Sequence, residues 1–286
     1  MDGYGLRRLV TRDTRDVESV IVTSIGMDFN LTPVRIQLTG RLAVEADHTV
    51  VDERLLYGRQ ARLIFAMLVV ERDRPVHRDE LAEILWPYGL PRTWDAALRG
   101  VVSKVRAFLV AAGLPQSAAS SGGSGTYQLQ LPPEVVVDVE TACSAVETAE
   151  QSLHENDPAR AIALAEYARK VVTRPFLPDA KGRWVDGVRD RLSKVRLWAL
   201  CVLSEAYAQR GRYQLAVRAA EDAIALEPFR ERTHQLLMRV HAAAGNPAEA
   251  LRAYDRCRRL LAEELGVDPT AETAALHLAL LRNGNE

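Results

Sequence analysis

The residues best suited to chemistry in this sequence lie along one face of a helix predicted over 93–112. Arg99, Ser103 and Arg106 are spaced i, i+4 and i+7, so a helix carries them on a single exposed line. Arginine can donate two hydrogen bonds to O6 and N7 of guanine, and serine reaches phosphates or base edges. Because an α-helix also fits the major groove, the line favours a DNA-reading helix, although any amphipathic helix carries a polar outer face.

Other polar residues around this helix are expected to hold the DNA backbone. Basic side chains, hydroxyl groups and bare backbone N–H groups all contact phosphates. The Ser- and Gly-rich stretch 117–125 is predicted to be a loop with a flexible tip, the wing, and a merely solvated loop is the alternative. A plain surface role is the alternative for the two arginines that begin the first helix. The residues assigned to the DNA interface are Arg59, Arg62, Arg92, Thr93, Arg99, Ser103, Lys104, Arg106, Ser124 and Thr126.

The elements that position these residues follow the order of a winged helix-turn-helix. Val34, Ile36 and Leu38 alternate with polar residues, which predicts a half-buried strand, and 42–44 is expected to pair with 50–51. Three helices and a hairpin then follow, with Thr93 as the expected N-cap of the third helix. The predicted helices span 59–70, 76–86 and 93–112, and the predicted strands span 126–131 and 135–137. Residues 1–33 are treated as an extension of unassigned role, with a strand expected within 17–25.

Beyond Asp138 the pattern is wholly helical. Gly211 and Gly245 lie 34 residues apart, which is the period of tetratricopeptide repeats, and Ala216 matches Ala250. An earlier copy begins at Asp157. The expected helices span 139–154, 157–174, 184–210, 212–226, 230–244, 247–264 and 270–282. The expected fold is mainly α with small β elements: an extension at 1–33, a winged helix-turn-helix at 34–138 and a TPR-like all-α bundle at 139–286.

The bulk composition excludes several classes of function. The net charge of the 286 residues is −1, so DNA binding must rest on a local basic face. The sequence carries no P-loop, GxGxxG, GxSxG or HExxH motif, and we expect no enzyme activity, cofactor or metal. His234 and His241 are interpreted as packed or surface residues, and the three cysteines as buried thiols in a reducing cytoplasm. Neither a signal peptide nor a membrane span is recognisable, so we expect a cytoplasmic protein.

Four motifs point to one family. Gly58-Arg59-Gln60 precedes an apolar run, Leu85-Trp86 ends the second helix, and Val102-Ser103-Lys104-Val105-Arg106 forms the core of the third. The most specific motif is Ala248-Glu249-Ala250-Leu251-Arg252-Ala253-Tyr254, followed by Leu260-Leu261-Ala262-Glu263-Glu264-Leu265-Gly266-Val267-Asp268-Pro269. From Val34 onward the sequence resembles the actinobacterial SARP family (Streptomyces antibiotic regulatory proteins). These pair an OmpR-type winged helix with a bacterial transcriptional activator domain.

The resemblance implies a transcription regulator that binds direct repeats near promoters. It further implies a head-to-tail homodimer on double-stranded DNA and activation by contact with RNA polymerase. The long extension before Val34 and the Ser/Gly-rich stretch 115–125 depart from the family pattern. Two alternatives stay open: a TPR-type adaptor that grips another protein, and a regulator whose bundle senses a small-molecule effector.

Overall fold

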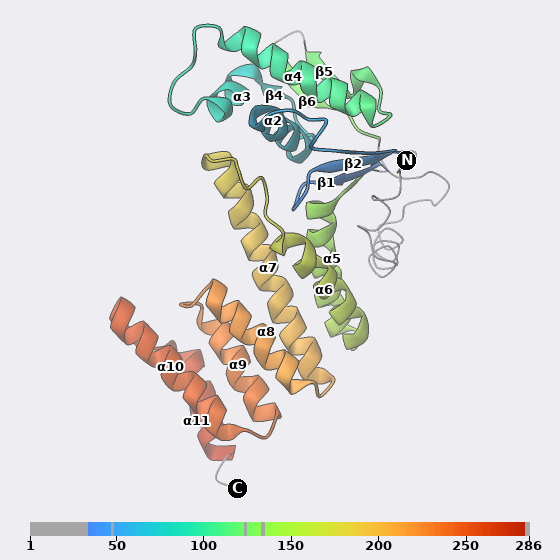
Figure 1. Cartoon of the computed structure of the whole chain (residues 1–286). Helices are drawn as coiled ribbons and strands as arrows, with labels where there is room; N and C mark the ends of the chain where they lie inside the picture. Colours follow the sequence, from blue (N-terminus) through green and yellow to red (C-terminus); the bar gives the residue numbers. More distant parts are fainter. Residues whose placement is uncertain (1–33, 47–48, 123–124, 133–134, 284–286) are drawn as a thin grey trace. The chain divides into compact units, whose positions relative to one another are not determined.

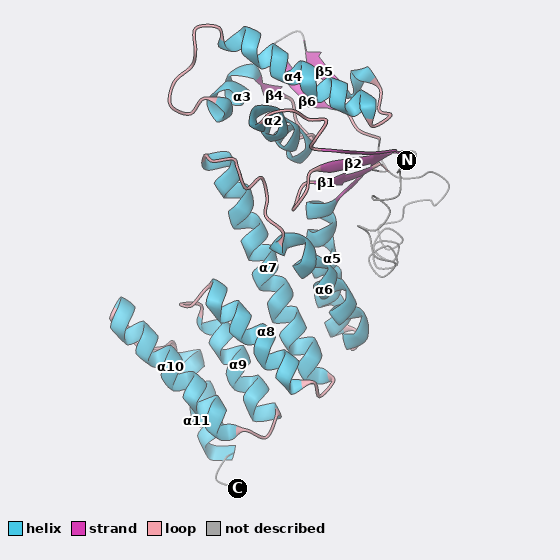
Figure 2. Ribbon diagram, viewed as in Figure 1, coloured by secondary structure: helices cyan, strands magenta, loops and turns pink. Residues whose placement is uncertain are grey.

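The computed structural model describes residues 34–46, 49–122, 125–132 and 135–283 (Figure 1). The extension 1–33, with its predicted strand, lies outside them. The described chain divides into two compact units. The first unit comprises 34–141 and 171–192, and the second comprises 142–170 and 193–283. Figure 2 shows that the described strands all precede a long run of helices, so the predicted mainly helical fold with small sheets is confirmed.

The N-terminal sheet has four short strands: β1 (Arg35–Gln37), β2 (Ala43–Ala46), β3 (Thr49–Asp52) and β7 (Val136–Val137). Their order is β3-β2-β1-β7, with β1 parallel to β7 and the other pairs antiparallel. Ile36 pairs with Val44, which pairs with Val51, and all three are buried, as the period-two alternation predicts. The predicted hairpin between 126–131 and 135–137 does not form. β7 pairs with β1 instead of with the strand that precedes it in sequence.

Three helices follow: α2 (Arg59–Val70), α3 (Arg78–Leu85) and α4 (Trp94–Ala111). The second helix starts later than expected because Val76–His77 forms a strand, β4. Val76 is fully buried and pairs with Tyr127, and the His77 Nδ1 then accepts a hydrogen bond from the Asp79 N–H at 3.4 Å as the N-cap of α3. The expected side-chain cap at Thr93 is absent, since this residue occupies the N-cap position of α4 without a capping hydrogen bond.

The stretch predicted as a loop over 117–125 contains a short 3-10 helix, η1 (Gln116–Ala118), and a strand, β5 (Ala119–Gly122). β5 pairs antiparallel with β6 (Thr126–Leu129), giving a second sheet of order β4-β6-β5. Serine and glycine carry little strand signal in sequence. The strand forms because β6 supplies the hydrogen-bonding partners that its backbone requires. We keep the name wing for the β5–β6 hairpin.

A close-packed core fixes α4 against α2. Phe65 and Phe108 meet edge to face, with ring centroids 5.3 Å apart and an interplanar angle of 79°. The predicted apolar stripe of α4 is buried from Leu98 to Leu109, and only Trp94, at its first turn, is partly exposed. Burial of that stripe leaves the opposite side of α4 to solvent.

The bundle consists of seven helices in the described part of the chain, and every predicted boundary falls within one residue of the observed one. They are α5 (Asp138–His154), α6 (Pro158–Thr173), α7 (Arg183–Gln209), α8 (Tyr213–Leu226), α9 (Glu231–Ala243), α10 (Pro247–Leu265) and α11 (Ala271–Asn283). Of the cysteines, Cys257 is buried whereas Cys143 and Cys201 are partly exposed, so the expectation of three buried thiols is corrected. Burial raises the pKa of Cys201 and of Cys257 to about 11.

The repeat has a backbone basis. Gly211 and Gly245 both adopt left-handed conformations, with φ of 68° and 72°, and Asn156 takes the corresponding place in the earlier copy with φ of 59°. Each ends a helix-to-helix turn at the same point of the repeat. The matched alanines, Ala216 and Ala250, are both completely buried, because small side chains let paired helices approach closely.

Candidate nucleic-acid interface

The outer face of α4 presents three polar residues to solvent. Arg99, Ser103 and Lys104 are exposed, and the Arg99 side chain keeps 66% of its surface accessible. The Arg99 guanidinium lies 3.0 Å from the Asp95 carboxylate one turn earlier. An exposed ion pair of this kind contributes at most about 1 kcal/mol, so Arg99 can exchange it for a phosphate or a base edge.

Arg106 departs from the predicted exposed line. It is half-buried, and its Nε–H donates to the carbonyl oxygen of Ala119 at 2.8 Å. That carbonyl belongs to the first residue of β5, the strand that the sequence did not predict. Arg106 therefore anchors the wing to α4, while Arg99 and Ser103 keep the exposed positions expected of them.

Arg78 is a candidate interface residue that sequence reasoning missed. It opens α3, and its backbone N–H donates to the Gly125 carbonyl at the wing at 2.9 Å. Its guanidinium lies 5.7 Å from the Trp94 ring centroid and 3.7 Å from the Asp95 carboxylate. Arg78 and Arg99 thus flank the same acid from two helices. The signal available in the sequence was an arginine at the start of α3, the helix that precedes α4.

The other described residues predicted to contact DNA lie on several different elements. Arg62 lies 3.6 Å from the Asp179 carboxylate, and the Arg59 Nη1 lies 3.5 Å from the Asp179 carbonyl, so both face the loop before α7. Arg92 and Thr93 are exposed before α4. Thr126 is half-buried on β6 opposite His77, and Ser124 lies outside the described residues.

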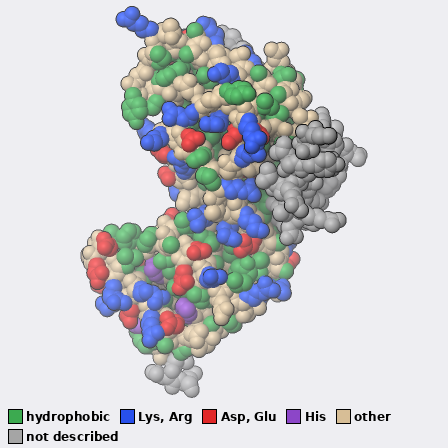
Figure 3. All heavy atoms as spheres, viewed as in Figure 1, with side chains coloured by type: hydrophobic (Ala, Val, Ile, Leu, Met, Phe, Trp, Pro, Cys, Tyr) green, Lys and Arg blue, Asp and Glu red, His purple; other side chains and the backbone are tan. Residues whose placement is uncertain are grey.

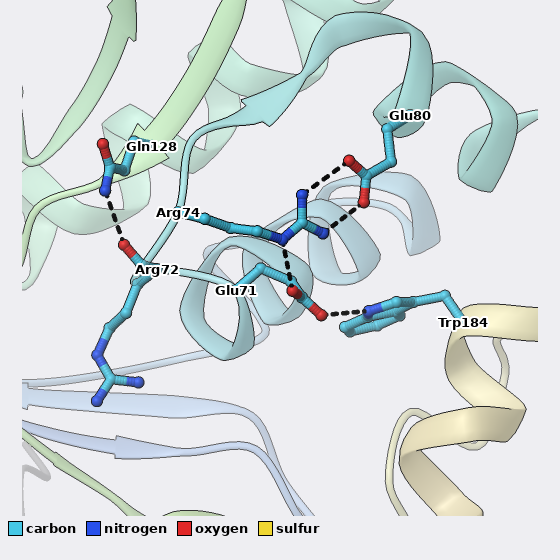
Figure 4. A network of polar contacts seen from close by, with 6 residues as sticks. All are labelled: Glu71, Arg72, Arg74, Glu80, Gln128 and Trp184. Carbon is cyan, nitrogen blue, oxygen red and sulfur yellow. Dashed lines mark hydrogen bonds and ion pairs between the residues drawn. The ribbon is translucent and has the colours of Figure 1, made fainter.

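A polar network joins α3 and α7 to the turn between α2 and β4 (Figure 4). Arg74 donates to Glu71 at 3.0 Å and to Glu80 of α3 at 2.6 Å, and the Trp184 indole N–H donates to Glu71 at 3.2 Å. Hydrogen bonding from Arg74 keeps the pKa of Glu80 below its ordinary value.

The same region also positions the wing. The Gln128 side-chain amide on β6 donates to the Arg72 carbonyl at 3.0 Å, as Figure 4 shows. Arg72 forms an ion pair with Glu140 at the start of α5. Since α3, β6 and α5 are tied to the α2–β4 turn, this turn orients the helix and the strand that border α4.

Basic and acidic side chains are mixed on the face of the molecule that Figure 3 shows, in keeping with a net charge of −1. Within the described ranges, no group of three or more His, Cys, Asp or Glu residues is placed to hold a metal ion. None of the described helices is long and apolar enough to cross a membrane.

Comparison with known proteins identifies the family. The model of the bacterial transcriptional activator domain matches residues 137–281, which is half of the chain. The chain belongs to this family. The resemblance to SARP regulators is confirmed by the relatives. "Regulatory protein AfsR" of Streptomyces griseus is 30% identical over 227 residues, and "Transcriptional regulator RedD" of Streptomyces coelicolor is 29% identical over 251 residues.

Coverage differs between these relatives. The AfsR alignment covers 79% of this chain but 23% of AfsR, so the chain spans about a quarter of that protein, whereas it spans 70% of RedD. A solved structure, "Mycobacterium tuberculosis EmbR in complex with low affinity phosphopeptide", superposes with a TM-score of 0.77 at 25% identity. The superposition covers 87% of this chain and 65% of the EmbR chain. The fold of this family member, a winged helix followed by the activator domain, therefore recurs in a regulator of known structure.

Proposed function

We propose that this SARP-type regulator binds specific DNA sequences through α4 and the wing and activates transcription. The observation that carries the proposal is the exposed face of Arg99, Ser103 and Lys104 on a helix whose other face is locked into the core. A rigid helix with forked donors and a flanking hairpin suits major-groove reading with backbone contacts beside it. Arg78 and Arg92 add phosphate-binding groups near the start of α4.

In this proposal the DNA-binding domain spans 34–138 and the activator domain spans 139–286. The family resemblance supports binding to promoter repeats as a homodimer and contact with RNA polymerase. A local feature agrees with protein contact: Tyr88 and Leu90, in the loop between α3 and α4, are 101% and 50% exposed. Apolar side chains left in solvent beside a DNA-reading helix fit a protein-binding surface.

The first experiment selects DNA from a random-sequence pool with the full chain and then measures affinity by fluorescence anisotropy. Arg99→Gln is expected to weaken binding of the selected sequence by about 5- to 150-fold, because a bidentate base contact contributes about 1–3 kcal/mol. Lys104→Gln is expected to weaken binding of all sequences alike and to lower the salt dependence by about one ion.

Arg258→Gln is the matched control, since Arg258 is an exposed arginine on α10 of the bundle. It should leave the affinity unchanged. Failure of the chain to enrich any sequence would reject DNA reading and favour the TPR-type adaptor. If a sequence is enriched, equal affinities of wild type and Arg99→Gln for it would reject reading by this face of α4.

The second experiment separates DNA binding from polymerase contact. Tyr88→Ser is expected to keep operator affinity while reducing transcription by purified RNA polymerase from a promoter carrying the selected sequence. Equal stimulation by wild type and Tyr88→Ser would remove this loop from the polymerase contact. The mass of the protein–DNA complex, compared on one and two copies of the selected sequence, tests the dimer.

A further inference from the structure

The second unit contains a hollow where the start of α8 meets the end of α9 and the start of α10. Its volume is about 570 Å³, within the range of small-molecule sites in proteins. The described residues that line it are Tyr213, Gln214, Leu215, Val217, Arg218, His241, Ala244 and Asn246. A mostly apolar wall with a few polar groups is typical of a site for an organic ligand. Figure 1 shows these three helices as neighbours in the bundle.

Among the described residues that line the hollow, Arg218 carries the formal charge, while Glu221 and Glu249 lie close enough to act on the pKa of His241. Arg218 is exposed, and in the described part of the chain no ion pair or hydrogen bond engages its guanidinium. None of the lining residues in the described set is acidic. The first turn of α8 also borders the hollow, where backbone N–H groups point out of the helix. These features favour an anionic group beside Arg218.

His241 supplies an independent observation. Its Nδ1 is shielded from solvent and makes no hydrogen bond to any described residue. An unsatisfied buried polar atom costs about 1–3 kcal/mol, which a bound ligand can recover, directly or after the ring turns about its Cβ–Cγ bond. Burial lowers the pKa of His241, so the ring is neutral near pH 7 and contributes a hydrogen bond rather than a charge.

In the preceding copy of the internal repeat, the residue at this position has a hydrogen-bonding partner. Tyr207 lies 34 residues before His241 and occupies the same place in the preceding copy, since each residue accepts at its carbonyl from the residue five positions later. The Tyr207 hydroxyl donates to Glu166 at 3.2 Å. In the later copy, a histidine stands at this position and the space beside it is the hollow.

We propose that this hollow binds a small organic anion, with the anionic group held by Arg218 and His241 and the apolar part lying against Leu215 and Val217. The recognised chemistry is an oxyanion, supplied by either a carboxylate or a phosphate. The site lies wholly within the second unit, so the inference does not depend on DNA binding.

The test uses the full chain with ¹⁵N-labelled histidine rings and assigns the His241 signals by their loss in His241→Gln. Sodium benzoate, inorganic phosphate and neutral benzamide are added separately at constant ionic strength. We expect saturable shifts of the His241 signals with benzoate or with phosphate, and no saturable shift with benzamide. Saturation by benzoate alone assigns a carboxylate ligand, and saturation by phosphate alone assigns a phosphate ligand.

Two variants decide whether the hollow is responsible. Arg218→Gln should weaken the apparent affinity at least tenfold while melting at the wild-type temperature, since Arg218 is exposed. Arg258→Gln, an exposed arginine outside the hollow, should bind like wild type. Equal responses to benzoate and benzamide, shifts that never saturate with either anion, or wild-type affinity in Arg218→Gln would each overturn the proposal.

Discussion

The arginines of α4 differ in their surroundings: one is exposed to solvent and the other holds the wing. The Arg99 guanidinium is exposed to solvent beside Asp95, whereas the Arg106 Nε–H donates a hydrogen bond to the carbonyl of Ala119 in the wing. Both have the same residue type and the same helical phase, so the sequence predicted one line for both. The difference depends on whether a strand lies opposite the side chain, which helical periodicity does not encode.

Arg106→Ala is expected to loosen the wing. Loss of one partly buried hydrogen bond contributes about 0.5–1.5 kcal/mol, so backbone amides of β5 should exchange with solvent about 2- to 10-fold faster. Hydrogen exchange measured residue by residue checks this. Arg99→Ala is the control and should leave β5 exchange unchanged, and equal rates in Arg106→Ala and wild type would show that the contact does not hold the strand.

His234 makes the stability of the bundle depend on pH. It is 4% exposed, and its Nε2 lies 2.7 Å from the Pro228 carbonyl, an acceptor that requires Nε2 to carry a proton. Burial lowers its folded-state pKa from 6.5, so below about pH 6.5 the unfolded chain binds more protons than the folded one. Stability should therefore fall as the pH drops from 7.5 to 5.5.

Urea unfolding at the two pH values measures this fall. His234→Gln retains a side-chain donor for Pro228 and removes the titration, so its stability should depend less on pH. His241, whose pKa is also lowered by burial, accounts for part of the remaining dependence. An unchanged pH dependence in His234→Gln would contradict the prediction.

Elements with strong periodicity were predictable, and elements that depend on a partner were not. The bundle helices matched to within one residue because their apolar faces repeat every 3.6 residues and Gly, Asn or Pro mark their ends. β4 has two residues and β5 is Ala-Ser-Ser-Gly, too short or too small to show alternation. Both exist because β6 lies between them.

The repeat turn at Gly245 provides a test of backbone conformation. Its φ is 72°, and a Cβ added there would meet nothing within 4 Å, so any cost arises from the backbone alone. Gly245→Ala is expected to lower the free energy of unfolding by about 1 kcal/mol. Gly245→Asn should cost less, since Asn156 adopts the same conformation in the earlier copy. In chemical denaturation, wild type should be the most stable, Gly245→Asn intermediate and Gly245→Ala the least stable. An alanine variant as stable as wild type would disprove the prediction.

At the scale of the whole molecule, the first unit is assembled from two separate stretches of chain. The Gly40 N–H donates to the Pro175 carbonyl at 2.8 Å, and Thr39 forms a β-bridge with Phe176. Phe176 lies against Trp184, with ring centroids 6.0 Å apart. The first two of these contacts join residues more than 100 positions apart, and no local pattern in the sequence predicts them.

Phe176→Ala in the full chain is expected to destabilise the first unit. Truncating a buried phenylalanine costs about 3–5 kcal/mol, which corresponds to amide exchange in β1 and β2 that is at least about 100-fold faster if global opening governs exchange. Phe229→Ala is the matched control, because Phe229 is 47% exposed in the second unit. Unaltered exchange of β1 in Phe176→Ala would show that the 171–192 stretch is dispensable for the winged helix.

Because the first unit includes the distant stretch 171–192, it limits how hybrid regulators can be built. A chimaera joined at residue 138 would pair the winged helix of one parent with the 171–192 stretch of the other. The Thr39–Phe176 and Glu71–Trp184 contacts would then join sequences that were never selected together. Recombination that exchanges winged helices should therefore succeed more often when 171–192 is exchanged together with the winged helix, with the second crossover inside α7 near residue 192.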